Sequence, residues 1–223
     1  MTDLALPPGL AAGLAQGIAA LGLDLAPAQQ HKLLDFVALL AKWNRTYNLT
    51  AIREPERMVT HHLLDALAVL PHLPSRPALR VLDVGSGGGI PGIPLAIARP
   101  DWQLTLVDAN HKKVAFVRQA AIELGLRNVD AQAVRVESLV PAAPFDVVIS
   151  RAFADIATFA ATSARHLAHD GALVAMKGVH PDEELTEVPA SLRVTATHAL
   201  HVPGLDAARH LVVMHRSDTV ESP

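Results

Sequence analysis

VLDVGSGGGIPG, residues 81–92, decides the fold of this chain. An apolar strand, Val81–Val84, runs into a turn in which five of the eight residues 85–92 are glycine. Glycine lacks a Cβ and tolerates positive φ, so the backbone can bend sharply at the strand end and present its N–H groups. The helix that follows adds the partial positive charge of its N-terminus. We therefore expect this turn to bring the backbone close to a ligand.

The residues beside the turn narrow the kind of ligand. A dinucleotide-binding fingerprint starting at Gly85 would have glycine or alanine where Ile90 stands, so the pattern is G-x-G-x-G instead. The carboxylate of Asp83 would repel a pyrophosphate but would attract an ammonium group. S-adenosylmethionine carries an ammonium and a sulfonium. We therefore expect Gly85 and Gly87 to bind S-adenosylmethionine.

Two later strand ends supply further candidates for binding this cofactor. Asp108 follows the second strand, 23 residues after Gly85, where a carboxylate can accept hydrogen bonds from both hydroxyls of a ribose. The alternative is that Asp108 caps the next helix. The third strand is expected to end at Val136 and Glu137, where a backbone amide and a carboxylate can recognise adenine. Glu137 could equally be solvated.

The overall composition bounds the class of protein. With 223 residues, half of them apolar, the chain can form one α/β domain and a helical extension. The absence of cysteine excludes disulfides, thiolate metal sites and cysteine nucleophiles. The 12 histidines form no zinc-binding pattern, so no metal is expected. No apolar run is long enough to span a membrane and no signal peptide is evident, which favours a cytoplasmic protein.

The pattern of apolar residues divides the chain into two parts. Residues 1–75 read as a helical extension, with helices over about 8–21, 27–43 and 55–69. Residues 76–223 alternate between strands and helices, which predicts a Rossmann-like, mostly parallel sheet covered on both faces and ending in an antiparallel pair. The seven expected strands span 80–85, 103–108, 132–136, 145–150, 171–177, 193–200 and 209–215, and the expected helices 91–98, 111–124 and 154–168.

The end of the fourth strand, Ser150-Arg151-Ala152-Phe153, lies where acceptor chemistry is expected. It is not the Asn-Pro-Pro-Tyr type of motif that accompanies methylation of exocyclic amines, and covalent C5 methylation of pyrimidines needs a cysteine. Guanine N7 has a free lone pair, so an enzyme that methylates it needs no general base and can rely on positioning. Arg151 could contact the cofactor or RNA, or form a surface salt bridge, and Phe153 could stack on a base or pack in the core.

Several segments together resemble those of the bacterial small-subunit rRNA guanine-N7 methyltransferase family, known as RsmG or glucose-inhibited division protein B. They are Asn48–Ile52, His62–Asp65, Asp83–Gly87, Ile90–Pro94, Ile149–Phe153 and the pair Lys177-Gly178, in the order of the family. The resemblance implies a class I S-adenosylmethionine-dependent methyltransferase fold. It also implies methylation of N7 of guanine 527 of 16S rRNA, in the small ribosomal subunit or its assembly intermediate. Its implied cofactor contacts are Gly85, Ile90, Val136, Glu137 and Arg151; it assigns no catalytic base.

The N-terminal extension carries the candidate RNA-binding residues. Cations and aromatic residues alternate between Lys42 and Asn48, with Arg53 and Arg57 close by, a mixture that suits phosphate contact and base stacking. From this group and the fourth strand end, Arg45, Asn48 and Phe153 are the predicted substrate contacts. Trp43 and Tyr47 could instead pack the helices onto the sheet. For His62 and Asp65, three residues apart, a structural hydrogen-bonding role is favoured.

Other functions remain open on the sequence. A methyltransferase could act on another RNA site, a small molecule or a protein. An NAD-dependent oxidoreductase could use Asp108 to bind ribose, although Asp83 and Ile90 argue against it. A noncatalytic cofactor sensor that binds RNA is the third alternative. The net charge of −3 means that any RNA-binding surface must be local.

Overall fold

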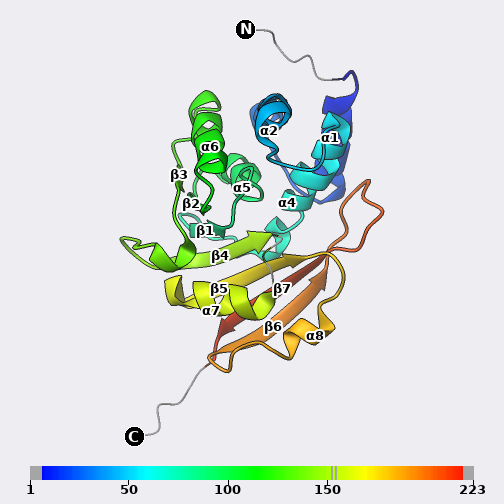
Figure 1. The fold of residues 1–223 in the computed structure, drawn as a ribbon. Helices are drawn as coiled ribbons and strands as arrows, with labels where there is room; N and C mark the ends of the chain where they lie inside the picture. Colours follow the sequence, from blue (N-terminus) through cyan, green and yellow to red (C-terminus); the bar gives the residue numbers. More distant parts are fainter. Residues whose placement is uncertain (1–6, 152, 154, 218–223) are drawn as a thin grey trace, which may run out of the picture.

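The computed structural model describes residues 7–151, 153 and 155–217 and contains one seven-stranded sheet (Figure 1). The strand order is β3-β2-β1-β4-β5-β7-β6. The strands are β1 (Arg80–Val84), β2 (Gln103–Val107), β3 (Val129–Gln132), β4 (Phe145–Arg151), β5 (Leu167–Lys177), β6 (Leu192–Ala199) and β7 (His210–Arg216). The α-helices are α1 (Leu10–Ala20), α2 (Pro27–Tyr47), α3 (Pro55–Met58), α4 (Asp65–Leu67), α5 (Gly92–Ala98), α6 (His111–Glu123), α7 (Ile156–Ser163) and α8 (Asp182–Leu185).

The first five strands of the sheet are parallel, and β7 runs antiparallel to both of its neighbours, β5 and β6. β1 lies between β2 and β4, so the order of strands reverses at this point. Asp83 of β1 is in register with Ile149 of β4, which brings the ends of these two strands together. Ligands of open α/β sheets bind outside the carboxyl ends of the strands at such a reversal. The fold therefore directs attention to the residues that follow β1 and β4.

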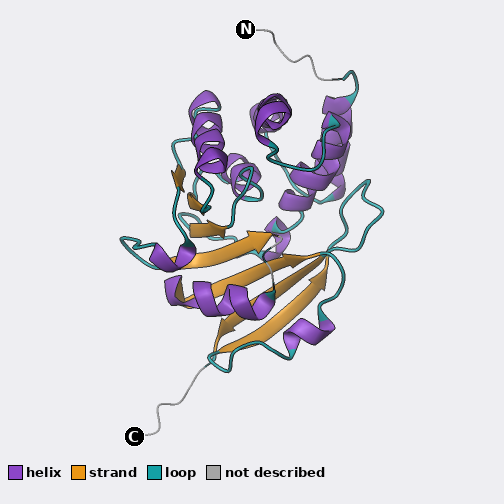
Figure 2. Ribbon diagram, in the orientation of Figure 1, coloured by secondary structure: helices purple, strands orange, loops and turns teal. Residues whose placement is uncertain are grey.

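Both faces of the sheet are covered by helices, as Figure 2 shows. Successive side chains of a strand point to opposite faces. Val81 accordingly packs in the core with α2, α5 and α6, whereas its neighbour Leu82 packs in the core with α7. β4 alternates in the same way. The uninterrupted apolar stretch of β1 thus reflects burial on both faces, as expected of the mostly parallel, Rossmann-like sheet predicted from the sequence.

The N-terminal helices extend the first of these cores. Phe36 of α2 faces Phe116 of α6, with ring centroids 6.2 Å apart. A Cβ placed on Gly88 would lie 3.3 Å from Leu40 Cδ1 and 3.6 Å from Leu49 Cβ, so α2 and the segment after it pack directly against the glycine turn. The division into a 1–75 extension and a 76–223 domain stays a prediction.

The helix expected over residues 55–69 is interrupted by a change of helix type. α3 continues into a π-helix, Val59–Leu64, and then into α4. π-turns within helices are rare and occur often at functional sites. This one carries His62 and leads directly into Asp65, whose side chains both point toward the end of β4. The apolar spacing alone predicts a helix here but not its type.

The bounds predicted for three elements, in two places of the chain, are wrong. The third strand was placed at 132–136, but β3 ends at Gln132, and Val136–Ser138 form a 3-10 turn (η3). The helix expected to reach residue 168 ends at Ser163, followed by a 3-10 turn (η4, Ala164–His166), and β5 begins at Leu167 rather than at 171. In both places short apolar runs fit a strand or a turn equally well, and pairing with neighbouring strands decides between them.

Replacement of Gly92 by alanine is expected to destabilise the fold by about 2 kcal/mol, since overpacking a tight core costs roughly 1–3 kcal/mol. A Cβ there would lie 2.6 Å from Leu106 Cδ2 and 2.7 Å from Asp83 Oδ2. Gly13→Ala is the matched control: it lies inside α1 with open space around its Cβ, so this change should stabilise the protein by about 0.5–1 kcal/mol. Urea unfolding measures both. Equal stability of Gly92→Ala and the wild type would contradict the packing described.

Candidate active site at the ends of β1 and β4

The glycine turn after β1 forms the base of the candidate site. Gly85, Gly87 and Gly89 have φ values of 71°, 55° and 78°, in the left-handed region that disfavours other residues. The N–H groups of Gly85 and Ser86 both donate to the carbonyl oxygen of Val107, at 2.9 and 3.0 Å, which ties the turn to the end of β2. Gly85 itself is exposed. The turn therefore presents bare backbone at the position where the sequence predicts a ligand.

Asp83 is fully buried directly beneath this turn. Its Oδ2 accepts a hydrogen bond of 2.9 Å from the Gly92 N–H, whereas its Oδ1 has no hydrogen-bond partner among the described residues. The pKa of this carboxyl is raised to about 7, because the effect of burial, with a smaller contribution from the nearby Asp108, outweighs the opposing effects of the Gly92 hydrogen bond and Arg151. A buried carboxylate with a free oxygen is costly on its own. An ammonium group would neutralise it, so Asp83 fits the amino group of S-adenosylmethionine.

Asp108, the predicted ribose ligand, has a structural role in this structure. Its Oδ2 accepts a 2.9 Å hydrogen bond from the Gly87 N–H, and its Oδ1 accepts one of 2.8 Å from the Asn110 N–H. Asn110, not Asp108, caps helix α6. A carboxylate has lone pairs for further partners, so these contacts hold Asp108 next to Gly87 without preventing ribose binding, which stays a prediction.

The other predicted cofactor contacts differ in how accessible they are. Ile90 is buried, at 5% exposure, and packs in the core between the sheet and α2. Val136 is also buried, and its carbonyl oxygen lies 2.8 Å from His166 Nε2. Glu137 is exposed. Both lie in η3, four residues beyond the end of β3, and not at a strand end as predicted.

Arg151, at the end of β4, contacts the N-terminal extension. Its Nη1 donates to the carbonyl oxygen of His61 at 2.9 Å and to Asp65 Oδ2 at 3.1 Å. The other oxygen of Asp65 accepts a 2.9 Å hydrogen bond from Arg209 Nε, just before β7. Asp65 is buried, so two guanidinium groups share one buried carboxylate. We call Asp65, Arg151 and Arg209 the arginine clasp. It joins the helical extension to the end of β4 and the start of β7, and Arg209 is the member for which no sequence pattern predicts a role.

His62 extends these contacts to the segment after α2. Its Nε2 lies 2.9 Å from the Thr50 hydroxyl, and its Nδ1 lies 3.4 Å from both terminal nitrogens of Arg151. Asn44, also buried, accepts a hydrogen bond from the Thr50 N–H and donates to the Ile52 carbonyl oxygen. These interactions hold residues 48–52 against the glycine turn. The structural hydrogen-bonding role predicted for His62 and Asp65 is confirmed.

The stability of the protein should depend on the charge of His62. Burial, reinforced by Arg151, lowers the pKa of His62 from 6.5 to about 3. The unfolded chain therefore binds a proton that the folded protein does not bind, so the contribution of His62 to stability is complete above pH 6.5 and is lost as the pH falls toward 3. At pH 4 the loss should approach about 3 kcal/mol, since one pKa unit corresponds to about 1.4 kcal/mol.

Unfolding of His62→Gln, compared with wild type between pH 7 and 4, measures this loss, and relative to the wild type the variant should gain stability as the pH falls toward 4. His31→Gln, at an exposed histidine, is the control and should leave the wild-type profile unchanged. Parallel profiles for wild type and His62→Gln would contradict the prediction.

Phe153 and Ser150 complete the surroundings of the turn. Phe153 Cδ2 would lie 3.7 Å from a Cβ on Gly85, so the ring stands next to the turn. It also packs against Phe159 of α7, with centroids 5.5 Å apart, and is partly exposed. Ser150 donates a 2.7 Å hydrogen bond to the Val84 carbonyl oxygen, which fastens β4 to β1. The third residue of the Ser150-Arg151-Ala152-Phe153 motif, Ala152, lies outside the described residues.

The candidate RNA-binding residues separate into inward and outward sets. Trp43 packs against Phe116 of α6, with centroids 5.6 Å apart, and against Tyr47. Core packing therefore accounts for Trp43, as it does for the buried Asn44. Arg45 and Asn48, the two predicted substrate contacts of this segment, are exposed at the end of α2, where Asn48 adopts a left-handed conformation with φ 48°. They remain available for RNA, and that role stays a prediction.

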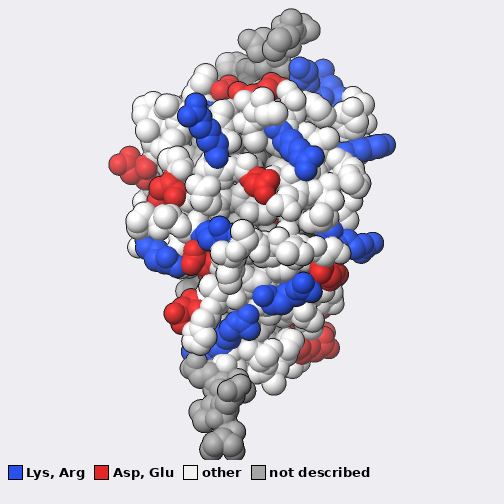
Figure 3. Space-filling model, turned by 90° about the vertical axis from the view of Figure 1, so that its left-hand side faces the viewer, with Lys and Arg blue, Asp and Glu red and all other residues white. Residues whose placement is uncertain are grey.

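Metal-binding clusters and membrane-spanning helices are both absent from the described residues. Within residues 7–151, 153 and 155–217, no group of three or more histidine or acidic side chains is arranged to hold a metal ion. No helix in the same residues is long and apolar enough to cross a bilayer. Figure 3 shows the face on the left of Figure 1, where β4 and β5 begin: basic and acidic side chains are interspersed over it.

Comparison with solved structures shows which fold this is. The chain resembles TrmN from Thermus thermophilus, with a TM-score of 0.57, 18% identity and coverage of 68% of this chain and 48% of that one. It also resembles a ribosomal protein L11 methylase from Lactobacillus delbrueckii subsp. bulgaricus, with a TM-score of 0.53, 18% identity and coverage of 69% and 77%. Together with the strand order, these similarities show the class I methyltransferase fold, as predicted.

Comparison with curated sequences shows the family. A protein named ribosomal RNA small subunit methyltransferase G from Azoarcus sp. (strain BH72) is 55% identical over 203 residues, covering 91% of this chain and 95% of that protein. One of the same name from Laribacter hongkongensis (strain HLHK9) is 53% identical over 199 residues, covering 89% and 95%. The family model described as rRNA small subunit methyltransferase G matches residues 29–212. The chain belongs to the rRNA small subunit methyltransferase G family.

Proposed function

We propose that this protein methylates N7 of a guanine in small-subunit rRNA. The methyl donor is S-adenosylmethionine. The single observation that carries the proposal is Asp83: a fully buried carboxylate with a free oxygen, beneath an exposed glycine turn, in a chain of a methyltransferase family. Family membership supports an rRNA substrate in the small subunit. The proposed position is guanine 527 of 16S rRNA, methylated in the cytoplasm within the subunit or its assembly intermediate.

For this reaction the protein has mainly to bind the methyl donor and the guanine and to orient them. When bound, S-adenosylmethionine supplies a methyl group on a positively charged sulfur. The N7 lone pair forms the new bond to the methyl carbon, the carbon–sulfur bond breaks with its electrons going to sulfur, and the guanine ring gains the positive charge. No proton leaves, so no general base is needed. The protein would then accelerate methyl transfer mainly by holding N7 in line with the carbon–sulfur bond.

The residues of the site divide this task between cofactor and substrate. Asp83 would pair with the ammonium of the cofactor, Gly85 and Gly87 would place their backbone against it, and Asp108 would accept its ribose hydroxyls. Glu137 and the backbone of Val136 would recognise adenine. Their positions around one strand reversal support these roles.

On the substrate side, Phe153 stands beside the turn and is partly exposed, which supports stacking on the target guanine. Arg151 is proposed to contact the cofactor while the arginine clasp holds it in place. Arg45 and Asn48 are exposed on the extension and would contact RNA. The net charge of −3 supports recognition of a folded particle more than of bare RNA.

Transfer of a labelled methyl group to isolated small subunits that lack the modification tests the proposal. We expect label in 7-methylguanosine after digestion of the 16S rRNA, and less label when naked 16S rRNA replaces the subunits. Label in another nucleoside, in ribosomal protein or in a small molecule would contradict the proposed acceptor. Binding of S-adenosylmethionine without any transfer would favour a noncatalytic sensor instead.

A further inference from the structure

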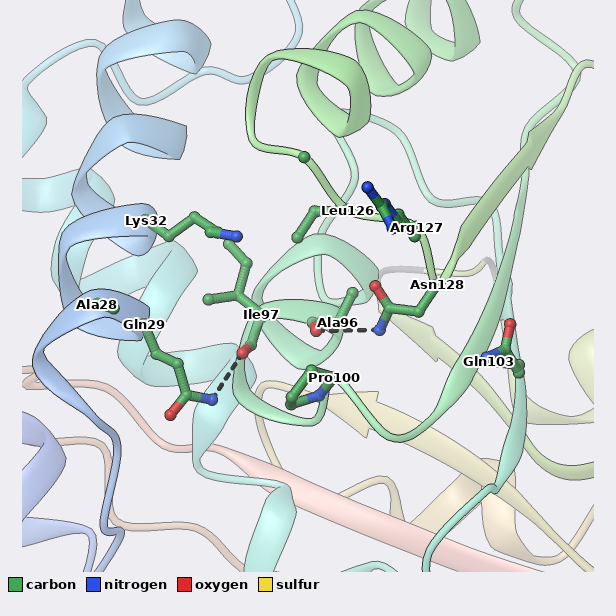
Figure 4. A pocket seen from close by; sticks show the side chains of 11 residues that line it. Ala28, Gln29, Lys32, Ala96, Ile97, Pro100, Gln103, Leu126, Arg127 and Asn128 are labelled. Atoms are coloured by element: carbon green, nitrogen blue, oxygen red, sulfur yellow. Dashed lines mark hydrogen bonds between the residues drawn. The ribbon is translucent and has the colours of Figure 1, made fainter.

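A cavity lies at the opposite end of the sheet from the glycine turn. It has a volume of about 350 Å³ and is lined by the start of α2, the end of α5 and the loop between α6 and β3 (Figure 4). Gln103, the first residue of β2, and Asn128, just before β3, place it at the amino ends of the strands. The methyltransferase site lies at the carboxyl ends. The cavity is therefore separate from the site already described.

The charged residues that line this cavity are all basic. Lys32 and Arg127 line it, and none of its lining residues is acidic. Neither cationic side chain has a hydrogen-bond or ion-pair partner within the part of the chain that the structure describes. Lys32 is partly buried, and Figure 4 shows it reaching from α2 toward the loop that carries Leu126 and Arg127. A partly buried ammonium and an exposed guanidinium that line one cavity without a counter-charge favour an anionic ligand.

The floor of the cavity offers a hydrogen-bond acceptor that no described residue pairs with. Asn128 is only 8% exposed, and its Nδ2 donates to the carbonyl oxygens of Ala96 and Arg99 at the end of α5. These bonds fix which atom of the amide faces the cavity: Oδ1, which receives no hydrogen bond from any described residue. Figure 4 shows this oxygen pointing into the space between Leu126 and Ile97. Because no described residue pairs with this oxygen, it is free to accept an N–H or O–H from a ligand.

The remaining walls are apolar or already satisfied. Gln29 Nε2 donates to the carbonyl oxygens of Ile97 and Ala98, at 2.8 and 3.0 Å, so the open end of α5 adds no free carbonyl from these two residues. Ile97, Leu126 and Pro100 provide apolar surface. A matching ligand therefore combines an anionic group, a flat or apolar body and a hydrogen-bond donor. Arginine and lysine together suit a phosphate.

We propose that this cavity binds a nucleotide unit, with its phosphate between Lys32 and Arg127 and an N–H of its base on Asn128 Oδ1. The unit can be a free nucleotide or one residue of an RNA chain, because both carry the same phosphate and base. The proposal does not rest on the function of the methyltransferase site.

The test uses ¹⁵N-labelled full-length protein saturated with S-adenosylhomocysteine, so that the cofactor site cannot take up the probe. Guanosine 5′-monophosphate is titrated in, with guanosine as the probe that lacks the phosphate. We expect the amide signals of Gly125, Arg127 and Asn128 to shift, and the monophosphate to bind at least about tenfold more tightly than guanosine, a difference of about 1.4 kcal/mol.

Single substitutions identify the groups responsible. Arg127→Gln and Lys32→Gln should each weaken binding of the monophosphate about fivefold or more. Arg165→Gln removes one exposed arginine outside the cavity and is the matched control, expected to bind like the wild type. A short single-stranded RNA in place of the monophosphate distinguishes the sources: shifts of the same amides support RNA, and shifts with the mononucleotide alone support a free ligand. The proposal is overturned by equal affinity for guanosine, by equal weakening in Arg165→Gln, or by unshifted amides with both probes at millimolar concentration.

Discussion

Asp83→Asn is expected to reduce the affinity for S-adenosylmethionine by about 10- to 100-fold, because a hydrogen bond to a charged group contributes roughly 1.5–3 kcal/mol. The variant preserves the shape of the side chain, and its amide oxygen can still accept the Gly92 N–H. Its NH₂ group, however, would take the place of the free Oδ1 and would face the ammonium of the cofactor with another donor. Isothermal titration calorimetry measures the change.

The same substitution should have the opposite effect on the free protein. Because burial raises the pKa of Asp83 to about 7, the folded protein holds a proton there that the unfolded chain releases near pH 4. The contribution of Asp83 to the stability of the free wild type should therefore fall as the pH rises from about 4 to about 7, opposite in direction to the contribution of His62, with the loss complete above that pKa. Asp83→Asn removes this loss and should be the more stable free protein at pH 8.

Asp24→Asn is the matched control for both measurements, since Asp24 is exposed between α1 and α2. It should bind S-adenosylmethionine like the wild type and show the wild-type dependence of stability on pH. Wild-type affinity in Asp83→Asn would contradict the assignment of Asp83 to the ammonium group.

Asp65→Asn is expected to destabilise the protein by about 3 kcal/mol, since removing one partner of a buried ion pair costs roughly 3–5 kcal/mol and both arginines are partly exposed. The change leaves Arg151 and Arg209 without the carboxylate that lies between them. Arg151 then loses its fixed position at the end of β4. The rate of methyl transfer should fall by about tenfold or more, because small misplacements of a positioning group are costly.

The arginine clasp can be tested apart from general destabilisation. Asp35→Asn is the matched control: its partner His31 is 3.7 Å away on the surface of α2, where such pairs contribute roughly 0–1 kcal/mol. A double-mutant cycle between Asp65→Asn and Arg209→Gln isolates the coupling, which should exceed about 0.5 kcal/mol. Transfer is assayed below the unfolding transition of every variant. Wild-type stability and rate in Asp65→Asn would show that the clasp does not position Arg151.

The strand-turn-helix at residues 80–98 was predictable because its signal is local. The residue patterns that indicate the buried strand, the glycine turn and the helix follow one another directly in the sequence. The structure places β1 and α5 within a residue or two of the predicted bounds. Asp83 and Gly85 were found for the same reason. The alternation that follows also gave the order of strands and helices, because each element carries its own apolar period.

The arginine clasp was not predictable because its contacts are long-range. Asp65 and Arg209 are 144 positions apart, and only the return of β7 between β5 and β6 brings them together. In the sequence, a single arginine before a strand looks the same whether its side chain forms an ion pair or is solvated. The π-turn at 59–64, which directs His62 toward Arg151, leaves the apolar spacing of a helix almost unchanged. Val136 was misplaced because a short apolar run fits a strand or a 3-10 turn equally well.

The most direct test of the central claim is a map of 7-methylguanosine in 16S rRNA from cells that lack this protein. The account predicts that the modification at guanine 527 is absent from these cells. It should return when the wild-type chain is supplied, and return only weakly with Asp83→Asn. An unchanged level of 7-methylguanosine at position 527 in cells without the protein would contradict the proposed function.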